Sequence, residues 1–382
     1  MLNDERYTQR DLRPDETRRC RNPCSAQSPW RIIIYQDGVD PSDGLAANHS
    51  RKSCVFYWSF VEYGMHALCH EEVWGTLCVM RSHDCNKLSG NISQLFQKAL
   101  ELFFGSVHDI QRSGIRVLVN GCSRGLEREH YDRYHILAGV GVVFADEPAL
   151  KEMLNCKGHA GTKPCLLCVN ATLHNSRGSA MHTITDDAIS VTNTNWRAFK
   201  KHSDASIQAV VRRVNALHAA FMAGTITGDA YELRTQMLGW TWTPANVLLN
   251  ERFNLKVAST TMYDWAHCYV HDGLGDVEFG QLMRSLHQSR STITYAKVGA
   301  YVDTFTMPKS YGKLDHLFKD APNRNNLKKG SFTCTGSEFL TLVPILHRFF
   351  SKVALQVGHC QLHVESFVAV LHVIVLLQAR CH

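Results

Sequence analysis

The sequence predicts an α/β protein in which a mixed β-sheet packs against helices. Three observations lead to this fold class. Five segments are short and rich in β-branched or aromatic residues, as strands are: 31–36, 55–64, 72–81, 115–121 and 135–145. Asn91–Phe104 places its apolar residues at helical spacing. From about 185 to 250 the pattern is helical, which predicts an all-helical insertion.

Four of these segments, all except 115–121, are expected to form one mixed sheet. Residues 31–36 (RIIIYQ) read as a short buried strand that ends at Asp37. The segments 55–64 and 72–81 suit a hairpin or a meander, because aromatic and β-branched side chains dominate both. Residues 135–145 (HILAGVGVVFA) read as a long buried strand that leads into Asp146.

The second half of the chain is predicted to be largely helical. Helices are indicated at 335–350 and at Val364–Gln378, the latter as a buried helix too short to span a membrane. Lys319–Lys329 (KDAPNRNNLKK) is predicted to be a basic, Asn-rich loop. Four segments result: a poorly ordered arm at 1–29, a first core part at 30–175, the helical insertion at 176–256 and a completing part at 257–382.

Composition limits the classes of protein to consider. Of the 382 residues 45% are hydrophobic and 20% charged, which supports a packed core and argues against wholesale disorder. The net charge of +6 is compatible with a nucleic-acid partner but does not require one. Residues 1–20 are charged throughout and do not form a signal peptide, so we expect the 14 cysteines to be reduced thiols, two of them on a metal.

Three acidic residues are candidate ligands for a catalytic metal ion: Asp37, Asp146 and Glu338. Asp37 and Asp146 each follow a predicted strand, and strand ends are rigid mounts for carboxylates that hold divalent ions. Other roles are open to both, because Asp37 with Gly38 is a common turn opening and Asp146 precedes Glu-Pro as a helix N-cap does. Glu338 follows Thr335 at the spacing of a capping box.

Basic residues precede Glu338 in the predicted loop. Arg324, Lys328 and Lys329 are suited to gripping a phosphate backbone. The alternative is a solvated charged loop without a partner. Because this loop leads into the helix that Glu338 opens, its charge favours a catalytic role for Glu338 over a purely structural one.

Cys165 and Cys168 form a CxxC pair, a spacing typical of half a zinc site. The chain offers two histidine pairs for the other half: His267 with His271, four residues apart on one predicted helix face, and His159 with His174, closer to the cysteines in sequence. Ordinary hydrogen-bonded histidines are the alternative, since the chain has 21. A thioredoxin-like role is disfavoured, because no strand runs directly into the pair.

Together these residues resemble cut-and-paste DNA transposases of the CACTA superfamily, in particular its Plavaka-like branch. The matching blocks within residues 30–375 are IIIYQDG, CVFYWSFVEYG, FADEPALKEMLNCKGHAGTKPCLLCVN, YDWAHCYVHDG and GSFTCTGSEFLTLVPILHRFF. The third block is the most specific, because it couples Asp146 to the CxxC pair. The fourth is similar to an Asp-x-x-His signature, here Asp264 and His267, although Ala266 stands where a Met is expected.

The resemblance implies an RNase H-like fold, in which the first and fourth strands are parallel neighbours. It assigns a catalytic triad to Asp37, Asp146 and Glu338, with Mg²⁺ or Mn²⁺ as the cofactor. It also implies a zinc knuckle that knits the insertion to the core. Its expected ligands are Cys165, Cys168, His267 and, as the first choice for the fourth position, His271.

The function implied is two-metal cleavage of phosphodiester bonds and strand transfer in the nucleus. The expected partners are element termini and target DNA, bound by a homo-oligomer, with no membrane. A catalytically inactive DNA-binding protein descended from a transposase is the alternative. The chain also ends soon after an apolar helix and has no recognisable N-terminal zinc finger, which keeps open a truncated or degenerate copy.

Overall fold

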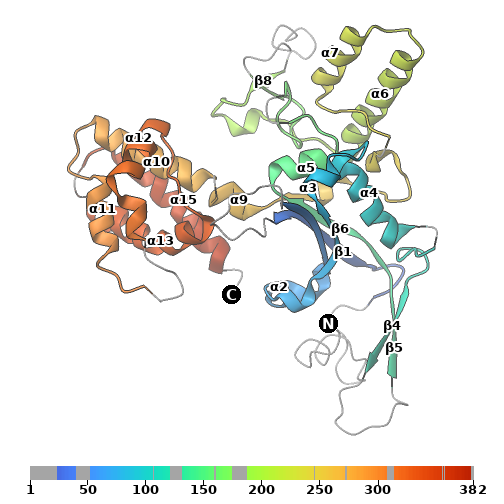
Figure 1. Ribbon diagram of the computed structural model, residues 1–382, viewed down its shortest axis with the longest axis horizontal. Helices are drawn as coiled ribbons and strands as arrows, with labels where there is room; N and C mark the ends of the chain where they lie inside the picture. Colours follow the sequence, from blue (N-terminus) through green and yellow to red (C-terminus); the bar gives the residue numbers. More distant parts are fainter. Residues whose placement is uncertain are drawn as a thin grey trace. The chain divides into compact units, whose positions relative to one another are not determined.

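The computed structural model describes residues 24–39, 52–105, 107–120, 131–158, 161–173, 187–244, 246–271, 273–307, 314–354, 356 and 358–379. The chain forms two compact units, residues 1–262 and 263–382, and each is described here by itself. The first unit combines a sheet with helices, and the second is helical (Figure 1). The predicted insertion at 176–256 belongs to the first unit, but it is not all-helical, because β8 (Ile189–Ser190) pairs with β7 (Ala171–Thr172).

The first unit is built on a five-stranded sheet with the order β3-β2-β1-β6-β9 (Figure 1). Its strands are β1 (Trp30–Val39), β2 (Ser53–Phe60), β3 (Gly75–Arg81), β6 (Ala138–Ala145) and β9 (Thr261–Tyr263). β1 pairs antiparallel with β2 and parallel with β6, and β2 pairs antiparallel with β3. The α/β class and the mixed sheet are therefore confirmed. Asp37 lies inside β1, so the prediction that the strand ends there was wrong by two residues.

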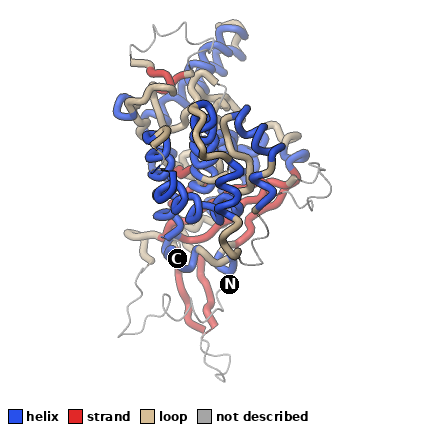
Figure 2. The backbone as a smooth tube through the Cα atoms, turned by 90° about the vertical axis from the view of Figure 1, so that its left-hand side faces the viewer, coloured by secondary structure: helices blue, strands red, loops and turns tan. Residues whose placement is uncertain are grey.

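The single strand predicted at 135–145 is divided in the structure. Its first part belongs to β5 (Tyr131–Ile136), which pairs with β4 (Ile115–Asn120) in a separate two-stranded ribbon. The ribbon extends away from the five-stranded sheet in Figures 1 and 2. At the break, the N–H of Trp30 donates to the carbonyl of Leu137 at 2.8 Å. Apolar residues stand on both sides of the break, Ile136 and Ala138, so periodicity alone did not reveal the change of partner.

Helices cover the sheet face on which Phe56 lies. α4 (Asn91–Phe104) has the bounds that were predicted, and its apolar stripe is buried. Its Phe96 stacks on Phe56 of β2 with ring centroids 5.9 Å apart. Burying such a side chain stabilises the fold by about 1.5–3 kcal/mol. The other helices of this unit are α2 (Gly64–Leu68), α3 (Ser82–Cys85), α5 (Glu147–Met153), α6 (Asp204–Met222), α7 (Gly228–Leu238) and α8 (Val257–Thr260).

The second unit is a helical bundle around an aromatic core. Its helices are α9 (Trp265–Tyr269), α10 (Leu274–Gln288), α11 (Tyr295–Val302), α12 (Asp320–Lys329), α13 (Gly336–Phe349) and α15 (Gln361–Ala379). The ring of Phe279 on α10 lies 4.8 Å from that of Phe332 and 5.2 Å from that of Phe367 on α15, between centroids. These contacts hold the two longest helices of the unit together.

The predicted loop at Lys319–Lys329 is wrong, because residues 320–329 form α12. Polar composition suggested a loop, but Asn323 and Asn326 are buried, and α12 packs against α10. Gly330 ends the helix in the left-handed region with φ 71°, where glycine has no Cβ penalty. Tertiary packing has here overridden weak helix propensity.

The C-terminal helix α15 is longer than was predicted. It spans 19 residues and, among the described residues, is the one helix long and apolar enough to cross a membrane by length and composition. The prediction that it is too short therefore fails. One side is buried against α10 and α13 through residues such as Phe367 and Leu371, whereas Leu362 and Leu376 are 79% and 66% exposed.

Candidate functional site

Asp37 and Asp146 lie on neighbouring parallel strands at the same level. Tyr35 of β1 is in register with Phe144 of β6, and their rings stack with centroids 4.3 Å apart. Each aspartate follows its aromatic partner by two residues in extended backbone, so both carboxylates belong on the same face of the sheet as the ring pair. Adjacent strands are about 4.8 Å apart. The structure thus brings together the two aspartates that the sequence indicated.

The Asp37 carboxylate is held by two donors. The Tyr35 hydroxyl donates to Oδ2 at 3.0 Å, and the N–H of Gly38 donates to Oδ1 at 2.7 Å. The side chain is half-buried. Tyr35 thereby links the stacked rings to the orientation of the carboxylate.

Asp146 serves as the N-cap of α5. Its Oδ1 accepts the N–H of Ala149 at 2.8 Å, and Pro148 occupies the first turn. Among the described residues, its Oδ2 has no hydrogen-bond partner. Capping and metal binding are compatible here, because the cap engages a single oxygen.

Sequence reasoning missed two charged side chains beside Asp146. Glu152 is exposed, yet partial loss of water and, second, the negative charge of Asp146 raise its pKa, while Lys52 opposes the shift. The Lys52 side chain lies over Gly38, where an added Cβ would come within 2.8 Å of Lys52 Cε. A signal was present, because Glu152 lies on the helix that Asp146 caps and Lys52 precedes the strand paired with β1.

Glu338 lies in the first turn of α13, in the second unit. The predicted capping box is present. Glu338 Oε2 accepts the Thr335 N–H at 2.7 Å, and Thr335 Oγ1 accepts the Glu338 N–H at 3.3 Å. The other oxygen, Oε1, lies 3.0 Å from Nε2 of His316. Both carboxylate oxygens are therefore engaged within the second unit.

The CxxC pair forms a hydrogen-bonded thiol pair in the first unit. The Cys168 thiol donates to Cys165, and the backbone N–H groups of Leu167 and Cys168 also favour a Cys165 thiolate. These bonds lower the pKa of Cys165 to about 6, although burial opposes the shift. The pKa of Cys168 is raised, because its proton is held by Cys165. Across the described ranges, no three His, Cys, Asp or Glu side chains already stand in metal-ligand geometry.

The predicted histidine ligands lie in the second unit. α9 ends at Tyr269, so His271 lies beyond the helix that was predicted to carry both histidines, but the two rings are neighbours, with centroids 5.8 Å apart. Asp264 caps α9 through Oδ1, and its Oδ2 lies 2.7 Å from Nδ1 of His267. The Asp-x-x-His signature is therefore a local hydrogen-bonded pair at the start of α9. The rival ligands His159 and His174 fall outside the described residues.

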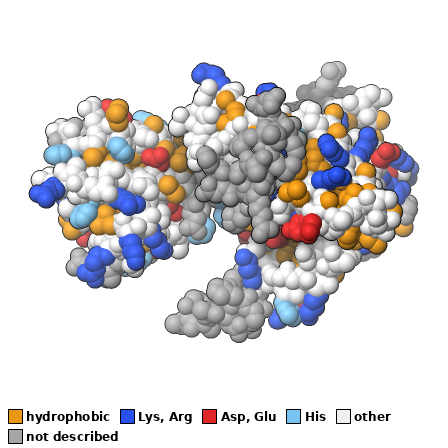
Figure 3. All heavy atoms as spheres, turned by 90° about the horizontal axis from the view of Figure 1, so that it is seen from above, with side chains coloured by type: hydrophobic (Ala, Val, Ile, Leu, Met, Phe, Trp, Pro, Cys, Tyr) orange, Lys and Arg blue, Asp and Glu red, His pale blue; other side chains and the backbone are white. Residues whose placement is uncertain are grey.

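The predicted DNA-contacting residues lie on α12. Arg324, Lys328 and Lys329 are exposed. Arg324 lines a cavity of about 420 Å³ together with Arg290 and His287, so two guanidinium groups contribute positive charge there. On the face seen in Figure 3, Lys and Arg side chains are dispersed and do not form one continuous basic patch.

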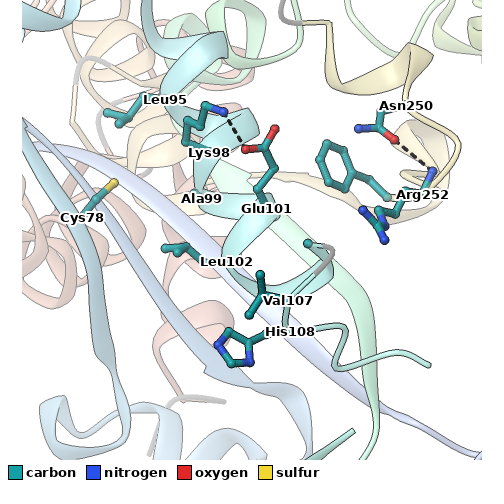
Figure 4. A pocket seen from close by; sticks show the side chains of 12 residues that line it. Cys78, Leu95, Lys98, Ala99, Glu101, Leu102, Val107, His108, Asn250 and Arg252 are labelled. Atoms are coloured by element: carbon teal, nitrogen blue, oxygen red, sulfur yellow. Dashed lines mark hydrogen bonds and ion pairs between the residues drawn. The ribbon is translucent and has the colours of Figure 1, made fainter. Parts of the chain in front are cut away.

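A separate cavity of about 620 Å³ lies in the first unit beside α4. Figure 4 shows Lys98 turned toward Glu101, and the two form an ion pair at 2.7 Å. Apolar walls come from Leu102 and Val107, with His108 nearby. None of the predicted site residues lines this cavity, so we assign it no role.

The chain matches no protein-family model and no curated protein. We therefore base the functional proposal on the residues themselves and on their geometry.

Proposed function

We propose that this chain is the catalytic part of a DNA transposase that cleaves phosphodiester bonds and transfers strands with divalent metal ions. One observation carries the proposal: Asp37 inside β1 and Asp146 directly after β6 lie at the same level of two neighbouring parallel strands, on the same face of the sheet. Carboxylates on such rigid mounts are typical of two-metal phosphoryl transfer.

The sheet topology supports an RNase H-like fold, which we propose for the first unit. In chain order the sheet strands are β1, β2, β3, β6 and β9, since β4 and β5 form a separate ribbon. The first and fourth of these are parallel neighbours, as the resemblance to transposases implies. The helices α6 and α7 supply the insertion that interrupts this core.

Asp37 and Asp146 fit Mg²⁺ or Mn²⁺. Carboxylate oxygens are the ligands that these ions prefer, and the register of β1 and β6 places the two aspartates on neighbouring strands about 4.8 Å apart. Bound there, the ions would activate the attacking oxygen and stabilise the leaving oxygen at phosphorus. Tyr35 would orient Asp37, and Lys52 would place a positive charge beside the substrate phosphates.

Glu338 is the third carboxylate that the resemblance implies. Its Oε2 already accepts two hydrogen bonds from Thr335, and its Oε1 lies 3.0 Å from His316 Nε2, so a metal would have to share these oxygens with their present partners. Glu152 is a second candidate for this position, because its pKa already responds to the charge of Asp146. Comparing Glu338→Gln with Glu152→Gln decides between them: the variant that loses Mg²⁺-dependent cleavage identifies the third ligand.

The test of the proposal is nicking of duplex DNA by the purified full chain in Mg²⁺ or Mn²⁺. We expect Asp37→Asn and Asp146→Asn each to lose at least about 100-fold in rate, since metal positioning supplies several kcal/mol. Asp229→Asn, an exposed aspartate on α7, is the matched control and should retain activity. Equal rates in wild type and Asp146→Asn would refute the metal site.

A catalytically inactive DNA-binding protein is the second candidate. The engagement of both Glu338 oxygens within the second unit favours it. This function predicts that wild-type protein binds DNA without cleaving it in either metal, and that the aspartate variants bind equally well. The nuclear location, the element termini as partners and assembly as a homo-oligomer on DNA belong to the transposase proposal.

A further inference from the structure

Backbone contacts bring three segments of the first unit together around the CxxC pair. Cys156, just after α5, is bridged to the segment that follows α7, and Cys168 is bridged to Lys201. The N–H of His202 donates to the carbonyl of Leu167 at 2.9 Å. Residues that are distant in sequence are thereby fixed beside the two cysteines by bonds that do not involve their side chains.

Four side chains with metal-binding atoms line one cavity at this junction: Cys156, Cys165, Cys168 and His202. The cavity volume is about 10 Å³, which is about the room that one water molecule or one metal ion needs. Three lysines line it as well: Lys151, Lys157 and Lys163. Their positive charge offsets the negative charge that thiolates would bring into the site.

A hydrogen bond engages one ring nitrogen of His202. Nδ1 lies 2.8 Å from Ser206 Oγ, and the same Oγ lies 2.8 Å from the carbonyl of Ser203. With Nδ1 held in this way, Nε2 is the nitrogen that is left for a metal. This is how metal-binding histidines are commonly oriented, with the second nitrogen held by a hydrogen bond.

We propose that Cys156, Cys165, Cys168 and His202 bind one Zn²⁺ ion as a tetrahedral Cys₃His site. The side chains have to rotate inward, because no three of them stand in ligand geometry as described. Each thiol that is still protonated releases its proton to solvent when its sulfur bonds to zinc. Cys156 and His202 then take the two positions that the sequence had favoured for His267 and His271. The ion would join α5, which Asp146 caps, to the start of α6.

The wild-type chain provides the first test, which does not depend on DNA cleavage. We expect about one zinc per purified chain. X-ray absorption at the zinc edge should report three sulfur ligands at about 2.3 Å and one nitrogen at about 2.0 Å. Two sulfurs with two nitrogens would overturn the proposal in favour of a second histidine. Protein that takes up no zinc after reduction and reconstitution would also overturn it.

Variants provide the second test, read as zinc affinity in competition with a chelator. We expect Cys156→Ser and His202→Asn to weaken binding by more than about 100-fold. Ser206→Ala removes the hydrogen bond that orients His202, and should weaken binding by about 10–100-fold. The controls His267→Asn and Cys78→Ser should bind as wild type. Loss of zinc in His267→Asn together with normal binding in His202→Asn would refute the assignment.

Discussion

Asp146 and Glu338 are both acidic residues at the start of a helix, yet the structure uses them differently. Asp146 caps α5 with one oxygen, while its other oxygen has no hydrogen-bond partner among the described residues. Glu338 engages both oxygens, one in the capping box of α13 and one with His316. Both residues have the sequence pattern of a helix start, but the Asp146 carboxylate has more oxygen atoms available for a metal ion than the Glu338 carboxylate. The number of uncommitted oxygens, and not the position at a helix start, distinguishes the two residues.

The largest expected effect comes from variants that separate the helix-capping role of Asp146 from its proposed metal-binding role. Asn is as good an N-cap as Asp, so Asp146→Asn should keep the stability of the fold. It should still lose at least about 100-fold in Mg²⁺-dependent cleavage. Asp146→Ala should lose both activity and about 1 kcal/mol of unfolding free energy. Chemical denaturation and DNA nicking measure the two effects, and a destabilised but active Asp146→Asn protein would contradict the metal role.

A second prediction concerns the basic side chains of α12, the helix that precedes Glu338 in the sequence. If α12 contacts DNA, replacing Arg324, Lys328 and Lys329 by Gln should weaken binding similarly for unrelated sequences. The slope of log affinity against log salt should flatten by roughly 0.9 per lost phosphate contact on duplex DNA. Fluorescence anisotropy over a salt series measures this. The matched control replaces Arg212 and Arg213, exposed on α6, by Gln. An unchanged slope in the triple variant would exclude α12 from the interface.

At Glu338 the expected effects are on stability. Thr335→Ala removes one half of the capping box and should cost about 1 kcal/mol of unfolding free energy. Glu338→Gln should preserve the box, because Gln also serves at this position. If Glu338→Gln abolishes cleavage at unchanged stability, the residue has a catalytic role in addition to its cap. If cleavage and stability are both unchanged, the third carboxylate lies elsewhere.

The smallest expected effect is a pH dependence in the second unit. Burial and, second, the neighbouring His372 lower the pKa of His347 below its ordinary value of 6.5, and the two Nε2 atoms lie 2.7 Å apart. The folded state thus takes up this proton less readily than the unfolded state. Stability present above pH 6.5 should be lost as the pH falls from 6.5 through the lowered pKa.

Thermal unfolding at a series of pH values measures this loss. His347→Gln should flatten the dependence, whereas His363→Gln, an exposed histidine on α15, should leave it as in wild type. An identical pH profile for wild type and His347→Gln would show that the histidine pair does not contribute.

The sequence predicted those features that depend on local pattern. The β-rich segments and α4 carry their own periodicity. Asp146 follows from where β6 ends, whereas Asp37 was identified although β1 continues to Val39. The division of residues 135–145 between two strand partners was not predictable, because apolar residues stand on both sides of the break and pairing is a long-range property. The same holds for α12, whose buried asparagines are stabilised by packing against α10. Cys156 and His202 escaped notice for a similar reason, since backbone bridges and not sequence spacing place them beside the CxxC pair.

The outer strand β9 has a consequence for synthesis of the chain. It lies next to β6 in the sheet, but a ribosome reaches it only after α5, α6, α7 and α8 have been made. Until then the nascent chain exposes an edge of β6, which is a template for pairing with other chains. Non-local strand pairing is also slow, so this edge of β6 would stay unpaired for longest at low temperature or without chaperones. Aggregation during expression should therefore begin at the edge of β6, the strand that precedes Asp146.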